Sequence, residues 1–331
     1  MVELKIALII LNWNGKTLLE QFLPSIVAHS KEADVYVADN ASTDASIEFV
    51  KSTFPSVKII QNTVNGGYAK GYNDVLRHIE ANVFCLLNND VEVTKNWLIP
   101  IIDNFKNNPN TAIIQPKLLD YKNRDYFEYA GAAGGFIDKY GYPYCRGRIF
   151  NTIEKDNGQY NDIADIFWAS GACFFVRSSV FRALSGFDEA FFAHMEEIDL
   201  CWRAKNLGYS IIYIGESTVY HVGGATLNNT NPKKTYLNFR NSLFTLTKNA
   251  KGNLFLIVFI RLLLDGIAGM KFLFELKPKH TFAVLKAHFV FYKHLRKILK
   301  QRQLTNYKAT YYQKTSIVFN YFIKKDIKFK S

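Results

Sequence analysis

Hydrophobic and polar positions follow two rhythms along the first 120 residues. Short apolar runs predict buried strands, and longer segments with apolar residues every three or four positions predict helices. The predicted strands cover residues 5–11, 34–38, 57–61, 83–87 and 111–115, and the predicted helices cover 16–29, 43–53, 69–81 and 96–107. Strands that alternate with helices in this way predict βαβ units and a parallel sheet.

The pattern changes after residue 116. Residues 117–165 are rich in Gly, Tyr and Asp and have no regular period, which favours an irregular segment, either an insertion or a substrate-shaping loop region. A strand (170–177), a helix (196–207) and two short strands (210–214 and 218–221) follow, and then a polar segment, 223–232, that we expect to be mobile. A long helical region is predicted from 234 to 299.

Polar residues follow the predicted strands at their carboxyl ends, where parallel sheets bind ligands. The strongest pattern is Leu86-Leu87-Asn88-Asn89-Asp90, a carboxylate directly after a buried strand. Such a carboxylate can hold a divalent cation that bridges phosphates, or it can belong to an Asx turn before the next helix. Helix capping explains the polar residues after Ala41 but leaves Asp39 free to accept a base N–H. Residues 65–71 suit a phosphate loop or a plain turn.

Two more groups carry candidate chemistry. Glu196, Glu197 and Asp199 begin a predicted helix, where acids suit the helix dipole. Asp199 can simply pair with Arg203, four residues further on. A partly desolvated carboxylate after the aromatic and His residues 191–194 can instead act as a general base. His221 ends a short strand before two glycines, where either a structural role or contact with a metal or phosphate fits.

Taken together, these segments resemble the family 2 glycosyltransferases of the GT-A fold, and more narrowly their bacterial rhamnosyltransferase-like branch. The resemblance is carried, in family order over about residues 5–224, by ALIILNWNG, VADNASTDAS, NGGYAKGYND, LLNNDVEV, SGACFFVRSSVFRALSGFDEAFF, EEIDLCWRAKNLGY and VYHVGG. It implies an α/β fold with a Rossmann-like mixed sheet flanked by helices. We expect a catalytic domain over 1–232, with a donor half (1–116) and an acceptor half (117–232), and a helical, membrane-associating region over 233–331.

The resemblance also implies a role for each matching position. A nucleotide-sugar donor would be bound by Asn12, Asp39, Asn65, Gly67, Lys70, Asn88, Asn89 and Asp90, with Asp39 reading a pyrimidine ring. Asp90 and His221 would hold Mg²⁺ or Mn²⁺ on the diphosphate. Trp168, Gly171 and His194 would shape the acceptor side. Glu197 would be the catalytic base, with Glu196 beside it and Asp199 as a rival.

Two positions depart from the family pattern. Asn88 stands where the family's D-x-D motif has its first acid, so the metal would have fewer carboxylate ligands. Glu197 stands where the family has an Asp, one methylene shorter. The chemistry stays the same: a base takes the proton of an acceptor hydroxyl as that oxygen attacks the anomeric carbon, and a single displacement inverts it.

Charge is concentrated at the C-terminal end. The net charge is +12, but residues 251–331 carry 17 Lys/Arg against 3 Asp/Glu, whereas the first 250 residues carry 24 bases and 26 acids. At 100° per residue, two polar stripes emerge. They consist of Arg261, Asp265, Lys271 and Glu275 within about 120°, and of Lys286, Lys293, Arg296, Lys297 and Lys300 within about 100°. Basic amphipathic helices favour an anionic membrane surface; the alternative is that they pack on the catalytic domain with solvated lysines.

The cysteines and the hydropathy of the chain indicate its cellular compartment. The four cysteines form no C-x-x-C pair, which excludes disulfide scaffolds and zinc fingers and indicates buried thiols in a reducing cytosol. The N-terminus lacks a signal-peptide pattern, and no run of 18 or more uncharged apolar residues is present. These observations indicate a cytoplasmic protein. The basic tail, together with the resemblance to a bacterial branch, many of whose members use lipid-linked acceptors at the inner leaflet, implies that it is peripheral on the inner face of a bacterial cell membrane.

Three functions are weighed. The first is an inverting, metal-dependent transferase that moves a sugar, with dTDP-rhamnose as the expected donor, to a glycan or polyprenyl-linked acceptor in cell-surface polysaccharide synthesis. The second is a non-catalytic, membrane-bound module that binds nucleotide sugars or glycans. The third is a nucleic-acid-binding protein that uses the basic tail, which we disfavour because the sequence carries no recognised binding motif.

Overall fold

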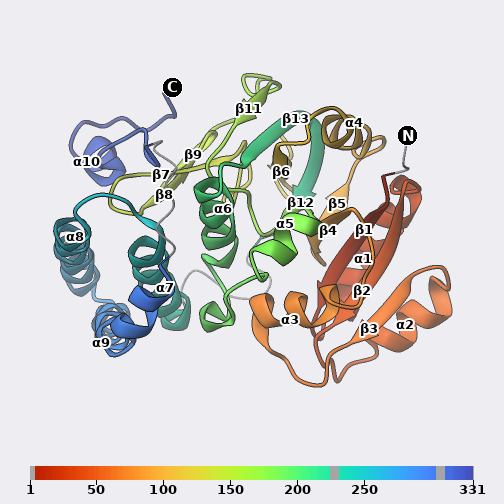
Figure 1. Cartoon of the computed structure of the whole chain (residues 1–331), viewed down its shortest axis with the longest axis horizontal. Helices are drawn as coiled ribbons and strands as arrows, with labels where there is room; N and C mark the ends of the chain where they lie inside the picture. The colour runs from red at the N-terminus through yellow and green to blue at the C-terminus, as the bar shows by residue number, and fades with distance from the viewer. Residues whose placement is uncertain (1–3, 224–230, 303–309, 331) are drawn as a thin grey trace.

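A computed structural model describes residues 4–223, 231–302 and 310–330 (Figure 1). Most of the segment that we expect to be mobile, 224–230, lies outside the described residues. The strands are β1 (Ile6–Asn12), β2 (Ala33–Asp39), β3 (Lys58–Gln61), β4 (Val83–Asn88), β5 (Val91–Val93), β6 (Thr111–Asp120), β7 (Gly135–Ile137), β8 (Pro143–Cys145), β9 (Arg148–Ile149), β10 (Thr152–Ile153), β11 (Ile163–Asp165), β12 (Cys173–Arg177) and β13 (Ser210–His221). The helices are α1 (Lys16–His29), α2 (Ser46–Thr53), α3 (Gly67–Leu76), α4 (Ile99–Asn107), α5 (Ser178–Ala183), η1 (Glu189–Phe191), α6 (Glu196–Asn206), α7 (Pro232–Asn249), α8 (Leu254–Phe274), α9 (Pro278–Lys300) and α10 (Ile317–Phe322).

The main sheet is mixed. Its strand order is β11-β13-β6-β12-β4-β1-β2-β3, and β5 pairs with β13. The half formed by β4, β1, β2 and β3 is parallel, as the βαβ pattern predicts, whereas β12 runs antiparallel to both β4 and β6. The fold is therefore the expected α/β arrangement with a mixed sheet and helices on both faces.

The sheet is buried on both faces, and alternate side chains of one strand serve two cores. In β1, Ala7 and Ile9 join the core that contains α3 and α6, whereas Ile6, Leu8 and Ile10 join the core that contains α1 and α4. Strands covered on both faces have nearly continuous apolar sequences, which is why the sequence predicts them well. This packing fixes the strand ends, and therefore the polar residues that follow them.

Three parts of the chain differ from the sequence prediction. Residues 117–165 are not irregular throughout, because β6 continues to Asp120 and β7–β10 form a small antiparallel sheet. The two short strands expected around residue 216 are one strand, β13, with a register shift between Ile214 and Thr218. The long helical region is divided into α7, α8 and α9.

The C-terminal helices lie at the end of the molecule opposite β3 and α2 (Figure 1). Leu243 of α7 and Phe291 of α9 belong to the same hydrophobic core as Ile198 of α6. All four cysteines are buried and unpaired, as predicted. In the described parts of the chain, no helix combines the length and the hydropathy needed to cross a bilayer.

Candidate active site

The register of neighbouring strands brings the polar residues at the ends of β1, β2 and β4 together. Asn12 pairs in register with Asp39 on the neighbouring strand, and Asn88 lies next to Leu11 on the other side. Asn89 Nδ2 donates to Asn12 Oδ1 at 2.9 Å, and the Ser42 amide donates to Asp39 Oδ2 at 3.1 Å. Four of the expected donor residues thus lie together at the carboxyl ends of β1, β2 and β4.

The glycine-containing loop closes one side of this edge. Asn40 Nδ2 donates to Asn65 Oδ1 at 2.9 Å, and the same oxygen accepts the Gly67 amide at 3.0 Å. Gly67 starts α3 with a φ of 77°. Lys70, expected at the donor, instead forms an ion pair with Asp74 along the helix at 2.7 Å. The loop is therefore built by asparagine contacts, with Lys70 held on its helix.

A buried histidine lies between two carboxylates at the opposite side of β4. His221 Nε2 is 3.1 Å from Asp90 Oδ1, and its Nδ1 is 3.3 Å from Glu128 Oε1. Burial alone disfavours the charged ring, but the two carboxylates outweigh it and raise the pKa of His221 to about 10. Without a cation, His221 therefore holds a proton, and its positive charge offsets one of the two carboxylate charges.

The residues around Asp90 fit a divalent cation that also takes phosphate oxygens. Among the described residues, no three or more His, Cys, Asp or Glu side chains are arranged as a ready metal site. Asp90 and His221 are nevertheless adjacent, and a carboxylate oxygen and an imidazole nitrogen are both ligand types that Mn²⁺ accepts. His221 would exchange its proton for the cation. Glu128 would then orient the ring, as carboxylates commonly do for metal-bound histidines.

Two acids at the start of α6 form the second half of the site. Glu196 is buried, at 4% exposure, whereas Glu197 is partly exposed, and each has an Oε2 atom without a hydrogen-bond partner among the described residues. Burial, and then the charge of Glu197, raises the pKa of Glu196 well above its usual range. Burial raises the pKa of Glu197 to about 7, although backbone amides oppose the shift. One acid is thus neutral, and the more accessible one titrates near neutrality.

Asp199 has a different environment. It is fully buried, and its oxygens contact Arg203 at 2.7 Å, Lys248 at 2.9 Å and Asn249 at 2.8 Å. Burial alone would raise its pKa, but the two cations reverse that effect and lower it. A carboxylate that is ion-paired on both sides is a poor proton acceptor. The structure therefore favours the simple pairing with Arg203 over a role as a rival base.

The loop before α6 is strained. Phe192, His194 and Met195 all have left-handed backbone angles, with φ between 64° and 74°. Such angles cost non-glycine residues about 1–2 kcal/mol each and need support from their surroundings. Asn241 of α7 supplies it, because its buried Nδ2 donates to the carbonyl oxygens of Phe191, Ala193 and His194 at 3.0, 2.9 and 2.7 Å. Helix α7 thereby holds the segment that presents the two acids.

The expected acceptor residues divide into two groups. Gly171 lies at the site, where its carbonyl oxygen accepts the Tyr68 hydroxyl at 2.8 Å. His194 is partly buried; burial, and then the charge of Lys234, lowers its pKa to about 4, so the ring is neutral. Trp168 is only 2% exposed, and its N–H donates to the Phe136 carbonyl at 2.8 Å. It lacks a free face for an acceptor and instead supports the backbone before Gly171.

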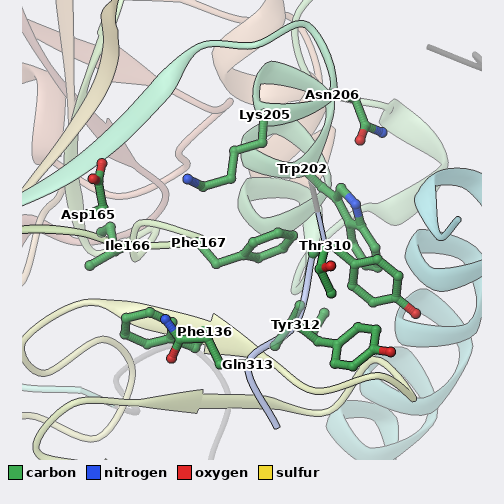
Figure 2. A pocket seen from close by; sticks show the side chains of 12 residues that line it. Phe136, Asp165, Ile166, Phe167, Trp202, Lys205, Asn206, Thr310, Tyr312 and Gln313 are labelled. Carbon is green, nitrogen blue, oxygen red and sulfur yellow. The ribbon is translucent and has the colours of Figure 1, made fainter. Parts of the chain in front are cut away.

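A separate hollow of about 160 Å³ lies at the other end of α6 (Figure 2). Trp202 and Lys205 of α6 line it together with Tyr311, and Lys205 extends in the direction of Asp165. The Trp202 and Tyr311 rings are stacked obliquely, 4.8 Å apart. None of the expected donor, acceptor or base residues lines this hollow, so it is distinct from the site.

Sequence reasoning missed two residues of this site. Glu128 falls in the segment that was expected to be irregular, where no period marks a buried acid. Asn241 falls in the long helical region with Asn238, Asn249 and Asn253, and nothing in the pattern distinguishes it from them. Glu128, three residues before Gly131, likewise gives no signal by itself. Only the fold brings Glu128 to His221 and Asn241 to the 191–195 loop.

The mixed sheet, the polar strand ends beside Asp90 and the acids at the start of α6 define a GT-A glycosyltransferase. The chain belongs to the family described as glycosyl transferase family 2, whose sequence model matches residues 7–184, more than half of its length.

Curated relatives agree with this family. The chain is 25% identical over 222 residues, 61% of its own length and 71% of the relative's, to an N-acetylglucosaminyl-diphospho-decaprenol L-rhamnosyltransferase of Mycobacterium tuberculosis. It is 23% identical over 285 residues, 83% of the chain and 87% of the relative, to a low-salt glycan biosynthesis hexosyltransferase of Haloferax volcanii. The chain is thus a glycosyltransferase with rhamnosyltransferase-like relatives.

Solved structures share the fold. GalNAc-T7, crystallised with UDP, GalNAc and Mn²⁺, superposes with a TM-score of 0.58 at 14% identity over 75% of this chain, which spans about half (48%) of that structure. A mannosyltransferase of Pyrobaculum calidifontis, in complex with GDP-Man and Mn²⁺, has a TM-score of 0.52 at 14% identity and covers 90% of this chain and 83% of its own. At these identities the likeness concerns the fold alone.

Proposed function

We propose that this glycosyltransferase is an inverting, divalent-metal-dependent enzyme that transfers rhamnose from dTDP-rhamnose to a glycan or polyprenyl-linked acceptor in cell-surface polysaccharide synthesis. The N-acetylglucosaminyl-diphospho-decaprenol L-rhamnosyltransferase of Mycobacterium tuberculosis, to which the chain is similar, supports the sugar and the acceptor class. The Mn²⁺ in two solved relatives supports the metal. The observation that carries the proposal is the Glu197 carboxylate, whose pKa burial raises to about 7. It follows the 191–195 loop, which contacts the expected donor loop where the Tyr68 amide donates to the Phe192 carbonyl at 2.8 Å.

The donor would lie along the strand ends. Asp39 would accept a hydrogen bond from the nucleoside, and Asn12 would donate one to it. The loop at Asn65 and Gly67 would line the sugar and the phosphates of the donor. Asp90 and His221 would hold the cation against the diphosphate. When bound, such a cation neutralises the charge that develops on the leaving nucleoside diphosphate.

Glu197 would perform the proton transfer. Its carboxylate takes the proton from the acceptor hydroxyl while that oxygen forms its bond to the anomeric carbon. The bond from the anomeric carbon to the phosphate oxygen breaks in the same displacement, and the nucleoside diphosphate leaves with the electron pair. One displacement inverts the anomeric centre. Glu196 stays protonated beside it, so that it adds no second charge to the site.

The basic C-terminal region would bring the enzyme to its acceptor. We place it at the cytoplasmic face of a cell membrane, because residues 251–331 carry 17 Lys/Arg and only 3 Asp/Glu. A lipid-linked acceptor would then be presented at the same surface.

The proposal is tested by donor binding and slow donor hydrolysis over a panel of nucleotide sugars, with Mn²⁺, Mg²⁺ or EDTA. We expect dTDP-rhamnose to be bound and hydrolysed with metal but not with EDTA, and Asp90→Ala to lose binding at least tenfold. Asp103→Ala, the same change at an exposed position in α4, serves as control. Binding of a different nucleotide sugar would correct the donor, and binding of none with any metal would overturn the proposal.

A further inference from the structure

Helix α8 is packed with Arg261 and Asp265 inward. Its buried positions, Ile257, Arg261, Asp265 and Gly269, are spaced by four and form one stripe. Arg261 Nε donates to Asp265 Oδ1 at 2.8 Å, and the Tyr142 hydroxyl donates to the same oxygen at 2.7 Å. Arg261 and Asp265, one half of the polar stripe that the sequence predicts, therefore form a buried, ion-paired contact with the 140–142 turn, whereas Lys271 and Glu275, its other half, are exposed.

The apolar side of α8 consequently faces away from the protein. Seven large apolar side chains of this helix are at least half exposed. They are Phe255, Phe259, Leu263, Ile267, Met270, Leu273 and Phe274. The exposure is greatest where α8 ends, with Phe274 at 85% and Leu276, in the connection to α9, at 88%. Exposed apolar surface on this scale marks an interaction site.

Helix α9 extends this face. It returns antiparallel beside α8 after a three-residue connection, and Thr281 Oγ1 donates to the Gly269 carbonyl at 2.9 Å to fix the hairpin. Four large apolar side chains of α9 are more than half exposed. They are Phe282, Leu285, Phe289 and Tyr292. Figure 1 shows α8 at the outer edge of the molecule and α9 at its lower corner. In the described residues, no other element covers this apolar face of the hairpin.

Basic residues surround the tip of the hairpin. Lys271 and Lys277 flank it and share Glu275 at 2.7 and 2.8 Å, which leaves one positive charge in excess. Lys279 follows at the start of α9 and Lys286 lies further along the same helix; both are exposed, and Lys286 Nζ lies 5.1 Å from the centre of the Tyr236 ring of α7. An apolar wedge with a basic rim matches the boundary between the anionic headgroups and the acyl chains of a bilayer.

We infer that the α8–α9 hairpin is a monotopic membrane anchor, in which Leu273, Phe274 and Leu276 insert into an anionic bilayer and the surrounding lysines contact its headgroups. This inference refines the membrane contact proposed above, since it assigns the contact to an apolar face and not to a basic stripe alone. A second copy of the chain fits the face less well, because two regions that each carry a large positive charge repel one another.

The test is co-sedimentation of the full chain with vesicles, without nucleotide sugar or glycan. We expect binding to vesicles of phosphatidylcholine with phosphatidylglycerol and much weaker binding to phosphatidylcholine alone. Phe274→Ser/Leu276→Ser should weaken binding at least tenfold, and Lys279→Glu/Lys286→Glu about fivefold or more per lysine. Ile163→Ser, at a similarly exposed apolar position in β11, should bind as the wild type does.

Thermal melts check that all variants fold. We expect each Tm to stay close to the wild-type value, because every substituted side chain is exposed. Wild-type binding that survives the tip substitutions, or no binding to anionic vesicles, would overturn the inference. A lipid-free dimer that the tip substitutions convert to a monomer, with no vesicle binding, would assign the face to a second copy. Donor hydrolysis in solution is measured separately. Its loss with vesicle binding intact would count against the proposed function and leave the anchor standing.

Discussion

The Tyr68 amide donates a hydrogen bond to the carbonyl oxygen of Phe192 at 2.8 Å. This contact joins the first turn of α3, which belongs to the expected donor half, to the strained loop before α6, which presents Glu196 and Glu197. The Tyr68 hydroxyl also reaches the Gly171 carbonyl at 2.8 Å. Tyr68 therefore connects the donor loop to two parts of the expected acceptor half, the backbone at Gly171 and the loop before α6.

Gly67 makes the close approach possible, and its replacement tests the junction. A Cβ at Gly67 would lie 2.4 Å from the Phe192 carbonyl oxygen, and the backbone there has a φ of 77°. Gly67→Ala should cost about 1–2 kcal/mol for the left-handed backbone alone, with an added cost for displacing the loop. We expect a lower Tm and weaker donor binding. Gly158→Ala controls for backbone strain, because Gly158 also has a positive φ but a Cβ there would meet only the end of the Asn161 side chain, at 3.2 Å. Equal effects of both substitutions would contradict the importance of the contact between Gly67 and Phe192.

The acid pair predicts a pH profile. Glu197 must be ionised to accept a proton, so kcat/KM should fall about tenfold per pH unit below about 7 and level off above it. The groups that face Glu197 are Glu196, Tyr68 and Cys201, whose pKa values are all raised by burial. Glu196→Gln, which resembles the neutral acid, should leave the midpoint in place. A flat profile between pH 5.5 and 8 would contradict Glu197 as the base.

Glu128 gives a test of the histidine cluster. Its carboxylate lies 3.3 Å from His221 Nδ1, so it sets the orientation and the basicity of the ring. Glu128→Gln should weaken Mn²⁺ affinity about 10–100-fold while leaving metal-free folding intact. Mn²⁺ titration followed by electron paramagnetic resonance measures this directly. Glu48→Gln, at an exposed position of α2, is the matched control. Unchanged Mn²⁺ affinity would show that His221 does not contact the metal.

The burial of Arg261 and Asp265 in α8 predicts that the effects of substituting these two residues on stability are strongly coupled. Arg261→Met removes the guanidinium from the buried Asp265, which keeps the Tyr142 hydroxyl at 2.7 Å and His288 at 3.5 Å, and should destabilise the protein by about 3–5 kcal/mol. Arg261→Met/Asp265→Leu removes both charges and should recover much of that loss. Thermal or urea unfolding measures both variants. If the single variant is as stable as the wild type, the stripe faces solvent and the apolar face is the buried one.

The sequence predicts those features of the fold that depend on residues close together in the chain. The buried strands and the polar residues that end them, such as Asn12 and Asp39, follow from apolar runs and chain punctuation. The orientation of α8 did not, because its amphipathic pattern is the same whichever side faces the protein. What decides the side is Tyr142 and the carbonyl groups near it, about 120 residues earlier in the chain. Glu128 and Asn241 escaped prediction for the same reason: their partners are distant in sequence.

The most direct test of the account compares Glu197→Gln with Glu216→Gln, the same change at an exposed position of β13. Both should bind the nucleotide-sugar donor with metal as the wild type does. Glu197→Gln should lose about 10²–10⁴-fold in transfer to an acceptor, because its amide cannot take the hydroxyl proton. Glu216→Gln should transfer normally. Transfer by Glu197→Gln at the wild-type rate, with donor binding intact, would contradict the central claim that Glu197 is the catalytic base.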